Sequence, residues 1–418
     1  MIGNRIKEIR KEANLTQQEL SNGIITRSYL SQIEKDAVQP SFEVLAKLSS
    51  RLNCSVDDFF HHAKDKGLIL SQLKKEIKTA EMNVNNNVFD KVEALIQKRE
   101  YLEHKDLDHY YKGILFWIHG KYHEKNKDYN KAIEMYNKSI ALLEEGDYSD
   151  EILRSLGSLG HVTSQTNENE KALTILNKAY KIIISEQIYG IVRISILKNL
   201  GIVHGKLNEY YSALNFLQEA KELNEHIGTY YKSGDISMAL GICNMKLKRY
   251  ADAKLSYECA LKFFKLNENI ELEAGTYTNL GILFLQQKDY KQAERQLKTA
   301  IELYQTIHTE EKVQMNVEIG LAQVYFCQGD LHNASLSCFD ILKFKEVNKY
   351  TAEAYEILGD ICSKKQSELE SSLCYYDEAK KILFELHLPY QNISKKIADI
   401  YVNMKKYKEA INFYKDSF

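Results

Sequence analysis

The chain has 418 residues, of which 44% are hydrophobic and 27% are charged, so it is long enough for more than one folded domain. Only 2 residues are proline, and because proline breaks helix interiors this scarcity favours an all-α fold with short turns. The 56 basic and 58 acidic residues give a net charge of −2, which excludes a nucleic-acid binder driven by bulk positive charge.

The cysteines and the apolar segments predict the compartment. The 7 cysteines are an odd number and form no C-x-x-C pair, so we expect reduced packing residues and neither a disulfide framework nor a zinc site. No apolar run approaches the ~18 residues of a membrane span, and the N-terminus is charged and amphipathic, unlike a signal peptide. These features predict a cytoplasmic protein without a membrane contact.

Residues 1–66 predict five short helices. A stripe of isoleucines from Ile2 to Ile9 forms the first, and Thr16 with Glu19 has the spacing of a capping box that starts the second. Asn22-Gly23 ends the second helix, and Thr26 caps a third over residues 27–35. Pro40-Ser41 forms a turn and a cap before a fourth helix over 42–52, and residues 56–60 form the last. The segment holds 10 basic and 9 acidic residues, so charge alone does not indicate DNA binding.

The second and third helices, with the tight turn between them, have the geometry of a helix-turn-helix. In that arrangement the start of the second of the two helices contacts base edges in the major groove. Arg27 and Gln32 carry groups suited to base contacts, and Gln17 is placed for a phosphate contact. The candidate DNA-binding residues are Gln17, Thr26, Arg27, Ser28, Tyr29 and Gln32. The alternative is that they form an ordinary solvated face.

The whole head resembles the Xre/Cro family of phage and bacterial repressors. The matching residues are Ile6-x-x-Ile9-Arg10, Leu15-Thr16-Gln17-x-Glu19-Leu20, Ser28-Tyr29-Leu30-Ser31-x-Ile33-Glu34, Pro40-Ser41 and Leu45-x-x-Leu48. The resemblance implies that Arg10 pairs with Glu34 in a structural role. The turn before Thr26 is one residue shorter than in most such heads, which is similar to the peptide-responsive regulators of Gram-positive bacteria.

A repeat of about 40 residues follows a short polar linker at 61–67. Alanines recur at 132, 172, 213, 253, 293 and 334, and a glycine precedes each of the first five by 12 residues, from Gly120 to Gly281. Small residues on facing helices allow close antiparallel packing, and stacked hairpins bury a shared core. The signature resembles tetratricopeptide repeats; armadillo and HEAT units share the length but not this glycine and alanine pattern.

The resemblance implies a right-handed superhelix of about nine hairpins over residues 67–418, which would bind peptide and dimerise. A degenerate unit is expected around Leu68–Arg99, and the seventh unit, with Gly359, Ser372 and Ala379, implies one extra residue in its turn.

The concave groove of such an array is the second candidate site. Asn199 and Asn279 each stand directly before Leu-Gly, where tetratricopeptide domains place asparagines that hold a peptide backbone. Arg154 or Lys198 can take a peptide carboxylate. The candidate peptide-binding residues are Arg154, Lys198, Asn199, Asp235, Thr278, Asn279, Asn316 and Gln323, and Glu353 maps to the same surface. For each residue alone, plain helix surface is an equal alternative.

No catalytic or cofactor motif is present in the sequence. His119 and His123 are four residues apart, as metal ligands can be, but they occupy inward-packing repeat positions and lack a third ligand, so core histidines are favoured. Phosphate-binding loops and nucleophile elbows are missing. We therefore expect a protein that is not an enzyme and holds neither metal nor cofactor.

Head and array together resemble the Rap/Rgg/NprR/PlcR/PrgX group of peptide-pheromone receptors, and most closely its NprR branch. The resemblance implies a homodimeric or higher-order quorum-sensing transcription factor that binds double-stranded DNA and a short signalling peptide. Two alternatives remain open: a regulator that binds a response-regulator protein of the sporulation phosphorelay, and a scaffold without signalling function.

Overall fold

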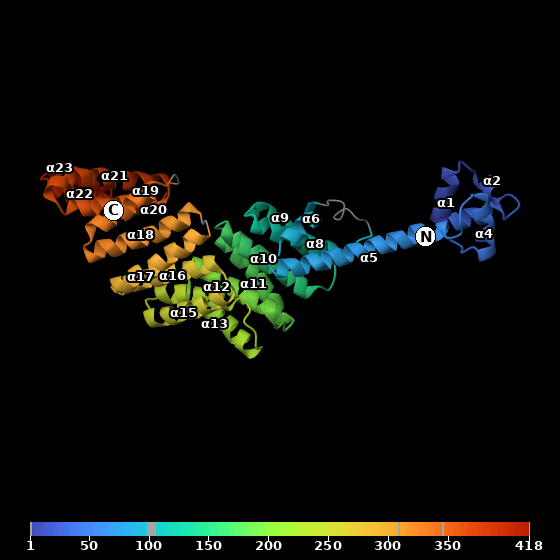
Figure 1. Ribbon diagram of the computed structural model, residues 1–418, viewed down its shortest axis with the longest axis horizontal. Coiled ribbons are helices and arrows are strands. Elements are labelled where there is room, and N and C mark those ends of the chain that lie inside the picture. The colour runs from blue at the N-terminus through green and yellow to red at the C-terminus, as the bar shows by residue number, and fades with distance from the viewer. Residues whose placement is uncertain (1, 98–105, 308–309, 345–346, 418) are drawn as a thin grey trace. The chain divides into compact units, whose positions relative to one another are not determined.

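The computed structural model describes residues 2–97, 106–307, 310–344 and 347–417, and this part of the chain contains helices and no strand (Figure 1). The chain divides into two compact units, Met1–Glu168 and Asn169–Phe418. The all-α prediction is confirmed.

Four short helices and the start of a fifth form the head. They are α1 (Ile2–Glu12), α2 (Gln17–Ser21), α3 (Arg27–Glu34), α4 (Phe42–Arg51) and α5 (Asp58–Asn85). Isoleucines and leucines of α1 to α4, among them the fully buried Ile6, Leu20 and Leu30, form one core with Phe59 of α5. This core fixes the positions of α2 and α3.

The predicted caps in the head are confirmed. The Thr16 side chain accepts a hydrogen bond from the Glu19 amide and the Glu19 carboxylate accepts one from the Thr16 amide, which completes the capping box. Thr26 and Ser41 cap α3 and α4 in the same way. Gly23 has a φ of 71°, which explains the glycine in the turn between α2 and α3.

The segment predicted as a polar linker, residues 61–67, is helical, because α5 continues through it to Asn85. The degenerate unit predicted around Leu68–Arg99 contains the later part of α5 and α6 (Asp90–Gln97), which contact each other. Residues 98–99 lie outside the described part of the chain.

Helical hairpins with short turns make up the rest of the first unit. Its helices are α8 (His109–Lys125), α9 (Tyr129–Leu143) and α10 (Ser149–Gln165). Helix α9 packs against both α8 and α10. The first predicted glycine–alanine seam lies between α8 and α9, where Gly120 faces the buried ring of Tyr136.

The second unit continues the pattern with alternating first and second helices of each hairpin. Its elements are α11 (Asn169–Ser185), α12 (Ile191–Lys206), α13 (Tyr210–His226), α14 (Ser233–Lys246), α15 (Tyr250–Leu266), α16 (Ile270–Gln286), α17 (Tyr290–Thr306), α18 (Glu311–Gln328), α19 (Leu331–Leu342), α20 (Lys349–Ser363), η1 (Gln366–Glu368), α21 (Leu369–Glu385), α22 (Gln391–Asn403) and α23 (Tyr407–Lys415). The 3-10 turn η1 stands where an extra residue was predicted, and Ser372 of α21 donates a hydrogen bond of 2.8 Å to the Gly359 carbonyl of α20.

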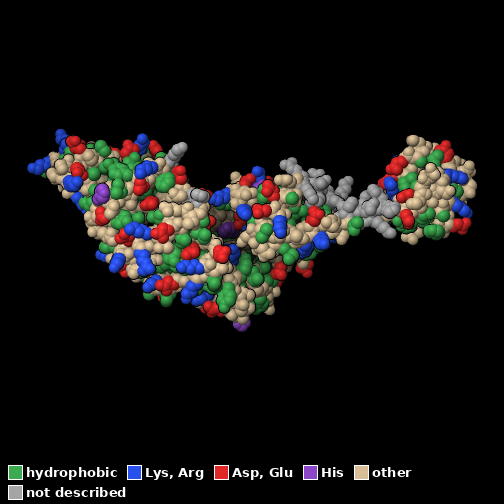
Figure 2. Space-filling view, viewed as in Figure 1, with side chains coloured by type: hydrophobic (Ala, Val, Ile, Leu, Met, Phe, Trp, Pro, Cys, Tyr) green, Lys and Arg blue, Asp and Glu red, His purple; other side chains and the backbone are tan. Residues whose placement is uncertain are grey.

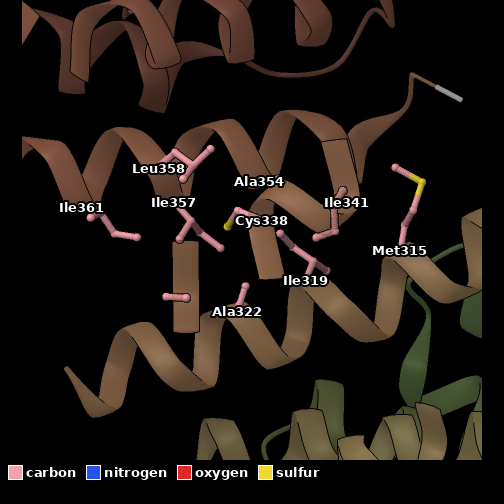
Figure 3. Close-up of a cluster of buried hydrophobic side chains, with 10 residues drawn as sticks. Met315, Ile319, Ala322, Cys338, Ile341, Ala354, Ile357, Leu358 and Ile361 are labelled. Carbon is pink, nitrogen blue, oxygen red and sulfur yellow. The ribbon is translucent and has the colours of Figure 1, made fainter. Parts of the chain in front are cut away.

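The repeat glycines work as predicted, by close approach. A Cβ at Gly241 would lie 2.5 Å from the ring of Tyr257, which is fully buried, and one at Gly281 would lie 2.6 Å from Leu297. The alanines of the second helices, such as Ala253, are also fully buried. Three helices then share each apolar seam, as in the cluster of Met315, Cys338 and Ile357 from α18, α19 and α20 (Figure 3).

The turns inside the hairpins repeat a left-handed residue. Lys127, Asn167, Asn208, Lys248 and Lys288 have φ values from 59° to 64°, and Gly329 takes the next such place at 82°. This conformation ends the first helix of each hairpin and lets the second begin two residues later.

Candidate functional site

The recognition surface of the head lies on α3. Leu30 and Ile33 face the core, so the helical period leaves Arg27, Ser28 and Gln32 exposed at the opposite side. Tyr29 is half-buried and packs against the head core. Thr26 is exposed but its hydroxyl accepts the hydrogen bond from the Tyr29 amide. Most of the predicted base-contacting residues are therefore presented together on one exposed helix end.

A buried ion pair holds this surface in place. Arg10 donates from Nε to Glu34 Oε1 at 2.6 Å and from Nη2 to Oε2 at 3.0 Å, as the resemblance implied. Gln17 donates its amide N–H to the same carboxylate at 2.8 Å. In this structure Gln17 thus links α2 to α3 through one of its two amide N–H donors, which leaves the second for the phosphate contact predicted for it.

One supporting residue of the head was missed in the sequence. Arg51, at the end of α4, donates from Nη1 to the carbonyl oxygens of Glu19 and Asn22, which lie at the end of α2 and in the turn after it. A lone arginine near a helix end carries no sequence signal for this contact, because its partners are backbone atoms 32 and 29 residues earlier in the chain.

In the second unit the first helices of successive hairpins lie side by side. Contacts join α12 to α14, α14 to α16, α16 to α18 and α18 to α20, and this row carries all but one of the predicted peptide-binding residues. Asp235, Asn279, Asn316 and Gln323 are half-buried. They remain candidates for contact with a ligand.

Three predicted residues of the row are less accessible than expected. Thr278 is 3% exposed and its hydroxyl donates to the Ala274 carbonyl of its own helix, so it does not face a groove. Lys198 and Asn199 are 9% and 5% exposed, and both interact with other residues of the chain. Thr278 also contacts Tyr304 of α17, the second helix of its own hairpin. Asn199 and Asn279 were expected to be equivalent, but Asn199 is buried and only Asn279 is partly exposed.

A groove of about 430 Å³ opens between α16, α18 and α20. Its apolar lining comes from Leu285, Tyr290, Phe326 and Ile357, and its neutral polar lining from Gln286, Gln323 and Cys327. Its charged lining consists of Lys288, Glu353, Glu356 and Asp360. Gln323 was predicted to face a ligand and Glu353 was placed on the same surface, so the structure brings these two together.

The carboxylates of the groove have different partners. Lys396 of α22 lies 2.7 Å from both Glu356 and Asp360, and Tyr376 donates to Asp360 at 2.7 Å. Glu353 has no ion pair within the described chain. Burial raises the pKa of Glu353, Lys349 lowers it, and Glu356 raises it.

The remaining candidate, Arg154, lies in the first unit and is already paired. Its Nη1 is 2.6 Å from Glu81 of α5, and its guanidinium stacks on Trp117 at 4.1 Å from the ring centre. Its Nε and Nη2 atoms are buried without a hydrogen-bond partner among the described residues. Arg154 thus joins α5 to the hairpins, which the sequence did not suggest.

Of the two histidines weighed as metal ligands, His119 is a buried packing residue, whereas His123 is half-buried and lies 3.8 Å from Asp128. His119 is 7% exposed, and burial lowers its pKa to about 4. Within the described residues no group of three potential ligands surrounds a metal position, and no helix is long and apolar enough to span a membrane. Acidic and basic side chains are mixed over the visible face of the hairpins (Figure 2).

Separate family models match the head and the hairpins. A helix-turn-helix model matches residues 6–59, and tetratricopeptide-repeat models match residues 114–185, 234–306 and 396–418. The transcriptional activator NprA of Geobacillus stearothermophilus is 24% identical over 96% of this chain and 98% of its own length. The transcriptional regulator SinR of Bacillus subtilis (strain 168) is 36% identical over 19% of this chain and 77% of SinR.

Solved structures share the fold. The apo form of the quorum sensor NprR from B. thuringiensis matches with a TM-score of 0.65 at 14% identity, covering 84% of this chain and 98% of that one. NprR in complex with its cognate peptide NprX matches with a TM-score of 0.53 at 14% identity, covering 82% and 98%.

Proposed function

Because the chain belongs to the helix-turn-helix regulators that carry a tetratricopeptide array, on their NprR-like branch, we propose that it is a peptide-responsive transcription regulator of the cytoplasm. It binds double-stranded DNA through the start of α3 and a short signalling peptide along the first helices of its hairpins. The observation that carries the proposal is the exposed set Arg27, Ser28 and Gln32 on a head that is 36% identical to the regulator SinR.

The proposed contacts follow from chemistry. Arg27 can donate two hydrogen bonds to guanine and Gln32 can pair with adenine, so both supply sequence preference. The chain acts as a homodimer, since two heads on half-sites about 34 Å apart give the specificity that one short helix lacks. The NprR–NprX complex supports a peptide as the ligand of the hairpins, with Asn279, Asn316 and Gln323 as its half-buried polar contacts.

The DNA role is tested by sequencing the DNA that co-purifies with the full chain. The wild type should enrich discrete palindromic sites, and the double variant Arg27→Ala/Gln32→Ala should lose that enrichment, since each good base contact contributes about 1–3 kcal/mol of discrimination. Lys11→Ala, an exposed change on α1, is the matched control and should retain it. Equal enrichment by the double variant would refute base recognition by α3.

The peptide role is tested by calorimetry with synthetic peptides encoded near the gene. We expect one to bind, and we expect Asn279→Ala with Asn316→Ala to weaken binding about tenfold or more, because two backbone-directed amides are lost. A regulator acting only through a response-regulator protein predicts no peptide binding and unchanged DNA recovery in the head variant.

A further inference from the structure

The end of α2 and the turn that follows it, residues 22–25, contain two carbonyl oxygens that the local backbone does not satisfy. A helix end leaves its last carbonyl groups without partners inside the helix. Here the amides of Ile24 and Ile25 both donate to the Ser21 carbonyl oxygen, at 3.0 Å each. Within the described chain, no backbone amide donates to the carbonyl oxygens of Glu19 and Asn22.

Arg51, in the last turn of α4, supplies the missing donor. Its Nη1 atom donates to the Glu19 carbonyl oxygen at 3.3 Å and also to the Asn22 carbonyl oxygen. Hydrogen bonds from a charged donor are stronger than bonds between neutral groups. Because α4 packs into the head core through Leu48, the two bonds attach the turn to a fixed part of the head.

The turn leads directly into the part of α3 that is proposed to contact DNA. It ends at Thr26, the N-cap of α3, and Arg27 and Ser28 follow at exposed positions. The far end of α3 is held by the buried ion pair between Glu34 and Arg10. Within the described residues no ion pair holds the near end, so its placement depends on the turn before it.

Two kinds of contact fix this turn. Ile24 and Ile25 are partly buried and pack against the head core, but apolar contacts are not directional. The hydrogen bonds from Arg51 are directional, so they define where the turn lies. Contacts with base edges need side chains held within about 0.5 Å and 10–20° of the productive geometry. The bonds from Arg51 therefore affect how accurately the start of α3 is presented.

We propose that Arg51 is a positioning residue for DNA recognition, which holds the turn between α2 and α3, and with it the start of α3, in the orientation that base contacts require. The inference rests on the proposed function, because it concerns how α3 meets DNA. In this role Arg51 acts through backbone carbonyl groups and contacts neither base nor phosphate. Its loss lowers sequence discrimination and leaves the attraction to the phosphate backbone in place.

The test uses the full chain and DNA duplexes. The wild type first selects binding sites from a pool of duplexes with a random core. The recovered duplex and a scrambled duplex of the same composition then serve as probes. The discrimination ratio, defined as the dissociation constant for the scrambled duplex divided by that for the selected one, is measured at several salt concentrations. The salt dependence reports the number of phosphate contacts.

Arg51→Ala should lower the discrimination ratio about tenfold, because the charged hydrogen bonds that hold the turn are lost. The slope of affinity against salt should not change. Arg51→Lys should recover most of the ratio, since its ammonium can donate to the same carbonyl oxygens. Lys47→Ala is the matched control, because it removes a cation one turn earlier on α4 whose partner, Glu43, lies on the same helix. It should keep the ratio of the wild type.

Hydrogen exchange without DNA shows whether the change is local. In Arg51→Ala the amides of Ile24 and Ile25 should exchange about tenfold faster than in the wild type, because the turn opens more often. The amides of Leu30 and Ile33, in the part of α3 that packs on the core, should keep their protection. Loss of protection throughout α3 would make Arg51 a general stabilising residue and overturn the positioning role.

The DNA measurements separate the two claims. A lower discrimination ratio in Arg51→Ala with an unchanged salt slope supports the positioning role. Equal loss of affinity for both duplexes, with a salt slope smaller by about 1, identifies a phosphate contact and overturns it. An unchanged ratio overturns it as well, and in both cases the proposed function stands. If the wild type selects no sequence, base recognition by the head fails and the positioning role fails with it.

Discussion

Gly201 and Gly205 lie one turn apart on α12, yet an added methyl group meets different surroundings at the two positions. At Gly201 a Cβ would be 2.5 Å from Cγ of Leu217 and 3.2 Å from the Ala213 carbonyl oxygen. At Gly205 the nearest atom is Sγ of Cys243 at 3.6 Å, an ordinary contact. The first glycine is needed for close packing of α12 on α13, and the second is not.

Gly201→Ala should therefore destabilise the hairpins although alanine favours helix. Overpacking costs about 1–3 kcal/mol and the gain in helix propensity returns about 1 kcal/mol, so the urea midpoint of the second unit should fall. Gly205→Ala should raise the midpoint, with a gain of up to about 1 kcal/mol. Equal midpoints for the two variants would contradict the packing argument. Circular dichroism during urea unfolding of the full chain measures both.

Glu34 should make the head sensitive to acid. Burial on its own raises the pKa of Glu34, but the hydrogen bonds from Arg10 and Gln17 lower it below its usual value. The folded head thus binds this proton less tightly than the unfolded chain does, so the pair stabilises the head above the unfolded pKa of about 4.3. That stability begins to decline as the pH falls below this value and is gone once the pH has fallen through the lower pKa of Glu34 in the folded head.

Hydrogen exchange of the α1 and α3 amides, corrected for intrinsic rates, measures this effect. Protection should decrease from about pH 5 to about pH 3 in the wild type. In Glu34→Gln protection should already be low at pH 7, because Arg10 is left buried without its anion. The free energy of opening of the head should fall by about 3 kcal/mol. Glu43→Gln, which removes an exposed pair with Lys47, should behave like the wild type. Full protection in Glu34→Gln would show that the ion pair does not stabilise the head.

At the scale of elements, two ion pairs of unequal burial hold α5 against the hairpins of the first unit. Glu81 and Arg154 have side chains that are 11% and 23% exposed, whereas Lys74 and Asp108 are 32% and 49% exposed. The two ion pairs have similar lengths, 2.6 and 2.7 Å, but they should differ in their contribution to the stability of α5, because solvent screens the pair of Lys74 and Asp108 more.

Glu81→Gln should release the second half of α5. We expect amide exchange in residues 71–85 to accelerate about tenfold, which corresponds to about 1.4 kcal/mol. Lys74→Ala should accelerate it by less than about threefold, the range of an exposed pair. If the two variants exchange alike, burial does not distinguish these contacts. Mass spectrometry of the full chain resolves the segment.

The elements that depend on local or periodic signals were predictable from the sequence. The capping residues Thr16 and Thr26 act on amides three residues away, and the 40-residue alternation from Gly120 to Gly281 follows from packing that every hairpin repeats. The end of α5 was not predictable, since its length is set by contacts such as that between Glu81 and Arg154, which are 73 residues apart.

The residues of the candidate sites fall into the same two groups, those whose surroundings follow from one helix and those whose surroundings depend on long-range contacts. Exposure of Arg27 and Gln32 follows from the period of a single helix, and the structure agrees with that expectation. Thr278 is buried beside Tyr304 of α17, a contact that the glycine and alanine pattern does not specify. Glu353 was placed on the groove surface from the sequence, whereas Glu356 and Asp360 were not, because they gain their surroundings from Lys396 in a later hairpin.

At the scale of the whole molecule, a regulator must couple two binding events on different parts of one chain. The coupling is a free energy, so it acts equally in both directions: if peptide changes the DNA affinity by some factor, DNA changes the peptide affinity by the same factor. Known couplings of this kind correspond to about 5- to 150-fold.

This reciprocity provides the last prediction. The dissociation constant of an operator fragment should be measured with and without saturating peptide, and that of the peptide with and without saturating operator, at one protein concentration above the dimerisation range. The two ratios should agree and differ from one. In Arg27→Ala/Gln32→Ala the operator should leave the peptide affinity unchanged, because the head no longer binds it. Ratios of one in both directions would mean that the groove and α3 act independently, and that the peptide controls something other than DNA affinity.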